Sequence, residues 1–356
     1  MIAKKGRCMM NRHSARAWLL LGLALLLTVS AGCATAGGPT KTTTGSGSGE
    51  TTGKATSTRV ELVEQWLGSA HAKPVTFAAE EKGCMNCHDG QKFTETGGGF
   101  VPRLATGASA VVTGPAGPRD WVVATDCRVC HTGPGVEFAK TGTIDIPGKT
   151  VSAGVGAVCI ACHNGWHGPG KSQNGGQRAP HLSVQADAIF ASNIATVGTA
   201  EQIDTRSPHQ KVQDVCVGCH MTGKPVPGDK ADTDAPANHS MKIRDTSGCK
   251  GTDCHKTDPL EAVVKEDLDG DGTKEKLQSE VDGLLATLRS TIESHAAGSF
   301  ESSSGEIVFA KGAKPSDTDY AAAYNYLFVI EDRSRGVHSP LFIPSLLQQS
   351  IGSLKK

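Results

Sequence analysis

The chain has 356 residues, of which only 4% are aromatic and 43 are glycine, a composition that cannot pack a dense core of side chains alone. Such a composition is typical of disordered chains, unless a large apolar cofactor fills the interior. Basic and acidic residues are equal in number, 36 each, and the lack of a basic stripe or of many aromatic residues argues against binding to nucleic acid.

Residues 1–33 have the order of a secretory signal: a basic stretch that ends at Arg16, an apolar run over residues 18–27, and then small residues. The apolar run is too short for a membrane span, which needs about 20 residues. Removal of residues 1–33, with five basic residues and no acidic one, leaves 36 − 5 = 31 basic against 36 acidic residues, a net charge of −5. The sequence therefore predicts an exported, acidic protein.

The signal ends in Val-Ser-Ala-Gly-Cys, which resembles a bacterial lipobox and predicts lipid modification of Cys33. A lipobox usually has Leu where Ser30 stands. Ordinary signal peptidase could instead cleave after Ala34-Thr35-Ala36. The predicted location is therefore the periplasm, or an outer-membrane or cell-surface lipoprotein.

Residues 34–58 are rich in Gly, Ser and Thr and predict a flexible tether. The remainder, residues 59–356, is expected to form one domain. Its first part, to about residue 265, is rich in loops, which indicates that a cofactor organises it.

The C-terminal part, residues 266–356, is expected to be helical. Apolar residues at helical spacing predict an amphipathic helix over 275–296, and a second helix is expected over 318–331. A third is predicted to begin with Ser339 as N-cap and Pro340 at the first helical position.

Five cysteine pairs, each followed directly by histidine, carry the strongest signal. Four have the form C-x-x-C-H, and the fifth has four residues between its cysteines. Their cysteines are Cys84, Cys87, Cys127, Cys130, Cys159, Cys162, Cys216, Cys219, Cys249 and Cys254, and their histidines are His88, His131, His163, His220 and His255.

The C-x-x-C-H pattern attaches a c-type haem: the two thiols bond the porphyrin, and the histidine is the proximal iron ligand. Disulfides, redox pairs or zinc sites do not require a histidine after every second cysteine. No cysteine outside the leader is left over. The sequence therefore predicts five covalently attached haems.

Seven histidines remain outside the leader and the motifs, enough to cap all five irons. Five lie in favourable contexts as distal ligands: His71, His181, His209, His239 and His338. His167 follows a motif closely, and His295 falls at the end of a predicted helix, so both are weaker candidates. Two imidazoles on every iron would leave no open position, which favours electron transfer at low potential over catalysis. Methionine as an axial ligand raises the reduction potential of a haem, so the scarcity of methionine favours low-potential haems. Met241 is the methionine available near the motifs.

A possible calcium loop precedes the first C-terminal helix. It matches the first half of an EF-hand, with aspartates at its first, third and fifth positions: Asp267, Asp269 and Asp271. Gln278 stands at the twelfth position, where a glutamate belongs, so Glu275 or Glu280 would have to help. The alternative is an acidic turn that stabilises the dipole of the following helix.

Three segments resemble the multihaem cytochromes of anaerobic, metal-respiring bacteria, in addition to the motifs. They are W-x-x-S-x-H-A at 66–72, Ala-Pro-His181 followed by Gln185-Ala-Asp187, and D-x-S-x-G-V-H-S-P at 332–340, where the family usually has Asn for Ser339. The likeness covers most of residues 59–350. It implies a mainly α fold with extensive irregular loops, organised around haems, in a protein that passes electrons between membrane carriers and outer acceptors. Its partners would be other redox proteins or cytochromes.

Two alternatives to a simple relay remain. Pentahaem nitrite reductases have Lys in place of one motif His, and here all five motifs end in His. A reductase of the nitrite or hydroxylamine type with one open haem stays an alternative, as does a subunit of an extracellular cytochrome filament. Quinol-oxidising relatives carry a membrane helix after the leader, and none is expected here.

Overall fold

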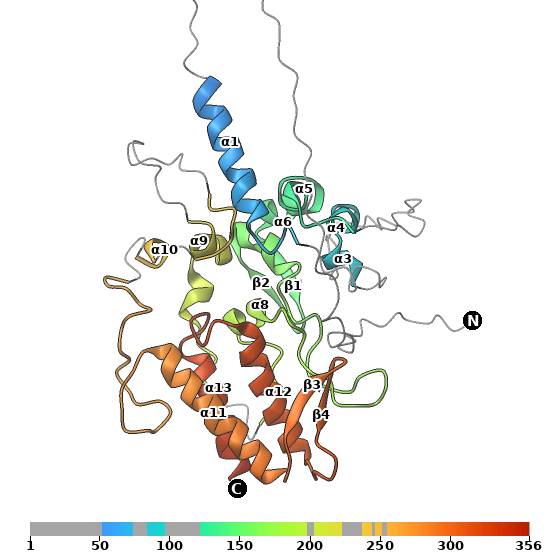
Figure 1. Ribbon diagram of the computed structural model, residues 1–356, viewed down its shortest axis with the longest axis vertical. Helices are drawn as coiled ribbons and strands as arrows, with labels where there is room; N and C mark the ends of the chain where they lie inside the picture. Colours follow the sequence, from blue (N-terminus) through green and yellow to red (C-terminus); the bar gives the residue numbers. More distant parts are fainter. Residues whose placement is uncertain are drawn as a thin grey trace, which may run out of the picture.

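The computed structural model describes residues 52–73, 84–96, 122–197, 203–222, 237–243, 246–250 and 255–355. The predicted leader, Cys33, most of the tether and Cys254 lie outside these residues. Two regions follow one another along the described chain. A motif region, in which all helices except the first are short, occupies the upper part of Figure 1, and a C-terminal region of longer helices lies below it.

The C-terminal region consists of three helices and one hairpin. The helices are α11 (Leu277–His295), α12 (Asp317–Asp332) and α13 (Phe342–Leu354). The antiparallel hairpin joins β3 (Phe300–Ser303) to β4 (Glu306–Phe309). The helices predicted over 275–296 and 318–331 are confirmed to within two residues at each end.

Side chains hold this region together. α11 turns a buried apolar stripe toward α12 and α13, and its members are Val281, Leu284, Leu285, Leu288 and Ile292. α12 begins with a capping box between Ser316 and Asp319, in which each side chain bonds the other residue's backbone amide. A single apolar core therefore unites the three helices.

The predicted start of the third helix is wrong by a few residues. α13 begins at Phe342 with Leu341 as its N-cap, while Ser339 and Pro340 lie in the turn before it. The amide of Ser339 bonds the carbonyl of Gly336 in that turn at 3.1 Å. The Ser339 hydroxyl is buried without a hydrogen-bond partner, so it does not cap the helix.

The motif region begins with α1 (Thr52–Leu67), which projects from the top of the molecule in Figure 1. The expectation that the coil extends to residue 58 is therefore wrong for residues 52–58, which continue the helix formed by 59–67. Helix propagation from an existing turn requires no apolar pattern of its own.

The other elements of this region are short. They are α3 (Met85–His88), α4 (Gly90–Thr96), α5 (Cys127–His131), α6 (Gly133–Thr141), the hairpin of β1 (Thr143–Ile146) and β2 (Lys149–Ser152), η1 (Gly154–Gly156), α7 (Ala157–Ile160), α8 (Gln185–Phe190), η3 (Pro208–Lys211), α9 (Cys216–His220) and α10 (Ser247–Lys250). A second apolar cluster joins several of them, and four motif cysteines pack at its margin: Cys130, Cys159, Cys162 and Cys216. No helix among the described residues is long and apolar enough to cross a membrane.

Candidate haem-binding site

Each described motif forms a single helical turn. In the first motif the His88 amide bonds the Cys84 carbonyl at 3.0 Å, and in the third the His163 amide bonds the Cys159 carbonyl at 2.9 Å. α5 and α9 each consist of the five residues of a motif. The turn therefore presents the cysteines and the histidine on one short element, as thioether attachment with axial ligation requires.

Every motif histidine faces one non-motif histidine. The ring centroids are 6.0 Å apart for His71 and His163, 6.4 Å for His88 and His181, 6.1 Å for His131 and His239, 6.2 Å for His209 and His255, and 6.2 Å for His220 and His338. These five ring pairs use each ring once. The non-motif members are the five favoured distal candidates.

The separation within the ring pairs fits one metal ion between two imidazoles. A metal–imidazole nitrogen bond is roughly 2 Å long and the ring centroid lies about 1 Å behind the nitrogen, so two rings on opposite sides of a metal have centroids about 6 Å apart. Ordinary aromatic contacts also fall between about 4.5 and 7 Å. Chance contacts of that kind would not match each motif ring with one non-motif ring five times.

Burial keeps several of these rings neutral, the form in which imidazole binds a metal. Desolvation, with the neighbouring His163 ring as a smaller cause, lowers the pKa of His71 to about 4. Desolvation likewise lowers the pKa of His181 to about 4, again with smaller contributions from neighbouring histidines. The pKa values of four more paired rings are lowered first by desolvation: His88, His163, His209 and His220.

Hydrogen bonds at Nδ1 orient four of the paired rings. The partners are Gln185 Oε1 for His163 (3.1 Å), the Met241 carbonyl for His220 (2.9 Å), the Ala237 carbonyl for His239 (2.7 Å) and Asp332 Oδ1 for His338 (2.6 Å). A ring that donates from Nδ1 keeps the lone pair of Nε2 for a metal. By contrast, Nδ1 of His181 is buried without a partner. Met241 contributes its carbonyl to the arrangement.

The segment 185–187 connects the third motif to its surroundings. Gln185 accepts from His163 and donates to the Glu331 carbonyl of α12 at 3.0 Å. Asp187 is fully buried and accepts from the Gly165 amide at 2.5 Å and from Asn193 at 2.6 Å. Desolvation raises the pKa of Asp187 to about 6, against these hydrogen bonds.

Cysteines of different motifs lie against one another. The Cys162 thiol hydrogen-bonds that of Cys87, and the Cys159 thiol hydrogen-bonds that of Cys216; both contacts raise the pKa of the third-motif cysteine. Cys130 also lies near Cys159: burial is the main cause that raises the pKa of Cys130, and the charge of Cys159 adds to it. The third motif is therefore adjacent to the first, second and fourth.

One cysteine of the first motif is not a free thiol. Cys84 is disulfide-bonded in the structure. Thioether formation at this motif would require that disulfide to be reduced first, because both motif thiols are consumed in the attachment.

The two weaker distal candidates take other roles. His167 stacks on Trp166 with centroids 5.0 Å apart, and Trp166 meets the edge of His181. His295 bonds the buried carboxylate of Asp319 at 2.8 Å. Neither forms a ring pair with a motif histidine.

The acidic loop before α11 brings three carboxylates together, and they differ from the predicted set. Oxygen atoms of Asp267, Asp269 and Glu280 lie within 4.8 Å of one another, and Glu280 is fully buried. A Cβ atom at Gly283 would lie 1.7 Å from Asp269 Oδ2, so glycine is needed there for Asp269 to reach the helix. Asp271 is not in this group, and its carboxylate accepts from the Thr273 amide at 2.7 Å.

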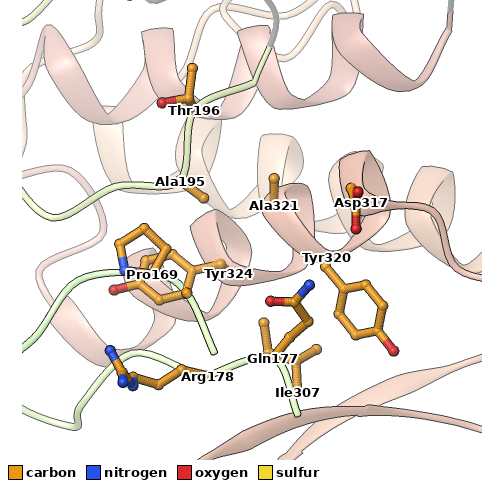
Figure 2. A pocket seen from close by; sticks show the side chains of 11 residues that line it. Pro169, Gln177, Arg178, Ala195, Thr196, Ile307, Asp317, Tyr320, Ala321 and Tyr324 are labelled. Carbon is orange, nitrogen blue, oxygen red and sulfur yellow. The ribbon is translucent and has the colours of Figure 1, made fainter. Parts of the chain in front are cut away.

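A cavity of about 300 Å³ lies between α12 and the loops around residues 170 and 195. Figure 2 shows Tyr324 beside Pro169 and Arg178, with Tyr320 and Asp317 across the cavity. The Tyr324 hydroxyl is buried without a hydrogen-bond partner. No member of a ring pair lines the cavity, so it is separate from the candidate haem site.

Comparisons with protein-family models, with curated proteins and with solved structures return no match.

Proposed function

We propose that the chain is an exported electron-transfer protein that holds five c-type haems, each iron between two imidazoles. The observation that carries the proposal is the one-to-one matching of five motif rings with five non-motif rings at centroid separations of 6.0–6.4 Å. The motif cysteines would hold the porphyrins and the ring pairs would hold the irons, with His71, His181, His209, His239 and His338 as distal ligands.

The haems, when bound, would supply one-electron chemistry between ferric and ferrous iron. The chain's own contribution is to hold neutral imidazoles in fixed orientation and to limit the access of water. The lowered pKa values of His71 and His181 support the first part, because a protonated ring has no lone pair for iron. The hydrogen bonds at Nδ1 support the fixed orientation, because they hold four rings in place.

Adjacency of the ring pairs supports a relay. The His163 ring is electrostatically coupled to its neighbours His88 and His220, which belong to two other pairs. The His209 ring is likewise coupled to His338, which links the fifth motif to the fourth. Together with the thiol contacts, these neighbours would make the haem between His71 and His163 the central one of the relay. The haem of the fifth motif would exchange electrons with it through the haem of the fourth motif.

The alternative of a reductase has less support. An open iron requires a proximal histidine without a second ligand, and each of the five motif rings has an imidazole opposite it. Lipid attachment at Cys33, export to the periplasm or cell surface, and other redox proteins as partners remain part of the proposal and rest on the sequence.

The test is electron paramagnetic resonance of the oxidised, haem-loaded protein. We expect only low-spin ferric signals from the wild type. His71→Ala should convert one haem equivalent to a high-spin signal, whereas His295→Ala is the matched control and should convert none. A high-spin haem in the wild type would favour the reductase, which carbon monoxide binding to the reduced protein would then verify.

Calcium is a second, structural proposal for the acidic loop. Oxygen ligands from two or three carboxylates suit Ca²⁺, and the grouping of Asp267, Asp269 and Glu280 supports a site in which Glu280 takes the place of the glutamate missing at position 278. Such a site would tie the loop to α11.

A further inference from the structure

The distal ligand His338 has a hydrogen-bond partner of a different kind from those of the other rings. Its Nδ1 atom lies 2.6 Å from Asp332 Oδ1, and the Asp332 side chain is fully buried. The other paired rings with a described Nδ1 partner bond neutral oxygens, from a side-chain amide or from backbone carbonyls. Among the described Nδ1 partners of the paired rings, the carboxylate of Asp332 is therefore the one charged group, and it bonds a ring of the pair His220 and His338.

The Asp332 carboxylate is directed at His338 by the surrounding chain. Its second oxygen accepts from the Ser334 hydroxyl, and that hydroxyl in turn accepts from the His338 amide at 3.1 Å. The neighbouring arginines are engaged with other carboxylates, Arg333 with Glu331 at 3.6 Å and Arg335 with Asp282 at 3.2 Å. The negative charge of Asp332 is thus shared mainly with the His338 ring.

The turn that carries these groups is held in place from two sides. Asp332 is the last residue of α12, and Arg333 ends the helix with a left-handed backbone, φ +63°. Gln278 of α11 donates to the Ser334 carbonyl at 3.2 Å. At Gly336, with φ +88°, a Cβ atom would lie 3.0 Å from Val281, so the turn packs closely on α11. The orientation of the His338 ring is therefore fixed by packed helices.

We propose that Asp332 is a positioning residue that tunes one iron through its hydrogen bond to His338 and makes the haem of His220 and His338 harder to reduce. A carboxylate acceptor increases the electron density on the ring and raises its basicity as a ligand. A more basic axial ligand stabilises ferric iron relative to ferrous iron, which lowers the reduction potential. The inference rests on the proposed function.

The effect has a direction along the relay. The His338 ring neighbours the His209 ring, which is paired with His255 of the fifth motif, and the His163 ring of the third motif. Lowering the potential of the haem between them places an energetically uphill step between the fifth haem and the remaining ones. The His181 ring, whose buried Nδ1 has no hydrogen-bond partner, lacks this effect.

The experiment compares Asp332→Asn with Asp319→Asn. Asp319 lies on the same helix, is equally buried and bonds His295, a ring outside the ring pairs. Asp319→Asn therefore makes the same change of charge and shape as Asp332→Asn, but at a ring that is not a proposed ligand. The readouts are the five midpoint potentials from a spectroelectrochemical titration and the low-spin resonance signals. His338→Ala identifies the signal of this haem by converting it to high spin.

We expect Asp332→Asn to raise one midpoint potential, changing the ferric–ferrous equilibrium constant about tenfold, or about 59 mV for one electron. One low-spin signal should shift with it, and Asp319→Asn should shift neither. If all five potentials of Asp332→Asn equal those of the wild type, the inference is overturned, while a high-spin haem in His338→Ala still supports the proposed function. If His338→Ala stays low-spin, the ligand assignment fails, and the proposed function fails with it at this haem.

A second variant serves if Asp332→Asn does not incorporate five haems. Ser334→Ala removes the hydroxyl that donates to Asp332 and leaves the carboxylate a stronger acceptor for His338. The same midpoint potential should then fall, opposite in sign to the first variant. An unchanged potential in Ser334→Ala would overturn the inference.

Discussion

In the C-terminal region, helices of 13 to 19 residues pack through fully buried leucine, isoleucine and phenylalanine side chains. Among the described helices from α3 to α10, by contrast, the longest has nine residues and five have fewer than six. Isolated helices of that length do not persist in water. The comparison indicates that side chains specify the C-terminal region, and that the motif region depends on the groups its cysteines and histidines would hold.

The largest effect should come from withholding haem. We expect the haem-free protein, produced without export and attachment, to lose most protection from hydrogen exchange over residues 122–222. Residues 277–354 should keep theirs, because their core contains no motif cysteine or histidine, and the residues between 179 and 203 that pack into that core should stay protected with them. Peptide-level hydrogen exchange measures both regions in one sample, with the haem-loaded protein as control. Equal protection of both regions in the haem-free protein would remove the distinction.

A cavity introduced into the C-terminal core should have the opposite effect: it should destabilise the C-terminal region and leave the motif region unchanged. Leu288 of α11 is fully buried, and Leu288→Ala should cost about 2–5 kcal/mol of unfolding free energy. The absorption spectrum of the haems should stay unchanged below the transition, because α11 carries no paired ring. Leu341→Ala, at a side chain that is 41% exposed, is the control and should change stability by less than about 0.5 kcal/mol. Loss of the low-spin spectrum in Leu288→Ala would show that the regions are coupled.

The sequence predicts the C-terminal helices well because their apolar residues recur at helical spacing over four turns. It fails at the start of α13, where Ser339 has the identity of an N-cap but is drawn into a buried turn. It also misplaces the end of the tether, since residues 52–58 are helical only as an extension of 59–67. Local patterns do not report such tertiary effects.

The candidate site divides in the same way. Cysteine and histidine spacing names the motif residues, and context selects the five distal candidates, but the matching of each distal ring to a motif depends on the path of the chain. His71 precedes the first motif and faces the third. Asp332 and Gln185 lie within the segments compared with the family, yet their bonds to His338 and His163 become visible only when the rings are placed.

Asp187 offers a pH-dependent test at the junction of the two regions. Its folded-state pKa of about 6 lies above the ordinary value of 3.8 because the carboxyl group is buried. The folded protein therefore binds this proton more tightly, so the stability it contributes is greatest below pH 4 and is lost as the pH rises through 6. The shift corresponds to about 3 kcal/mol at most.

The measurement is the unfolding free energy of the wild type minus that of Asp187→Asn, as a function of pH. The difference cancels the groups common to both proteins and should decrease between pH 4 and pH 6.5. An increase over this interval would mean that the hydrogen bonds from Gly165 and Asn193 outweigh the desolvation of the charge.

Calcium should stabilise the C-terminal region by a smaller amount. A site of the affinity found in extracellular modules would add about 1–2 kcal/mol at 5 mM Ca²⁺. Asp269→Asn should abolish the shift in thermal midpoint, whereas Asp271→Asn should retain most of it, because Asp271 is outside the carboxylate group. Magnesium at the same concentration controls for ionic strength. A wild-type midpoint that does not respond to Ca²⁺ would leave the acidic turn as a stabiliser of the α11 dipole.

The smallest expected effect concerns the N-terminus of α12. The Ser316 hydroxyl accepts from the Asp319 amide at 3.2 Å and donates to the Asp319 carboxylate at 2.6 Å. Ser316→Ala should cost about 1 kcal/mol, and Ser290→Ala, on the exposed face of α11, should cost less than about 0.5 kcal/mol. Both losses should appear in the exchange of residues 277–354 and leave residues 122–222 unchanged. A loss that spread into the motif region would mean that α12, through Gln185 and Asp332, transmits the stability of the C-terminal core to the proposed haem ligands.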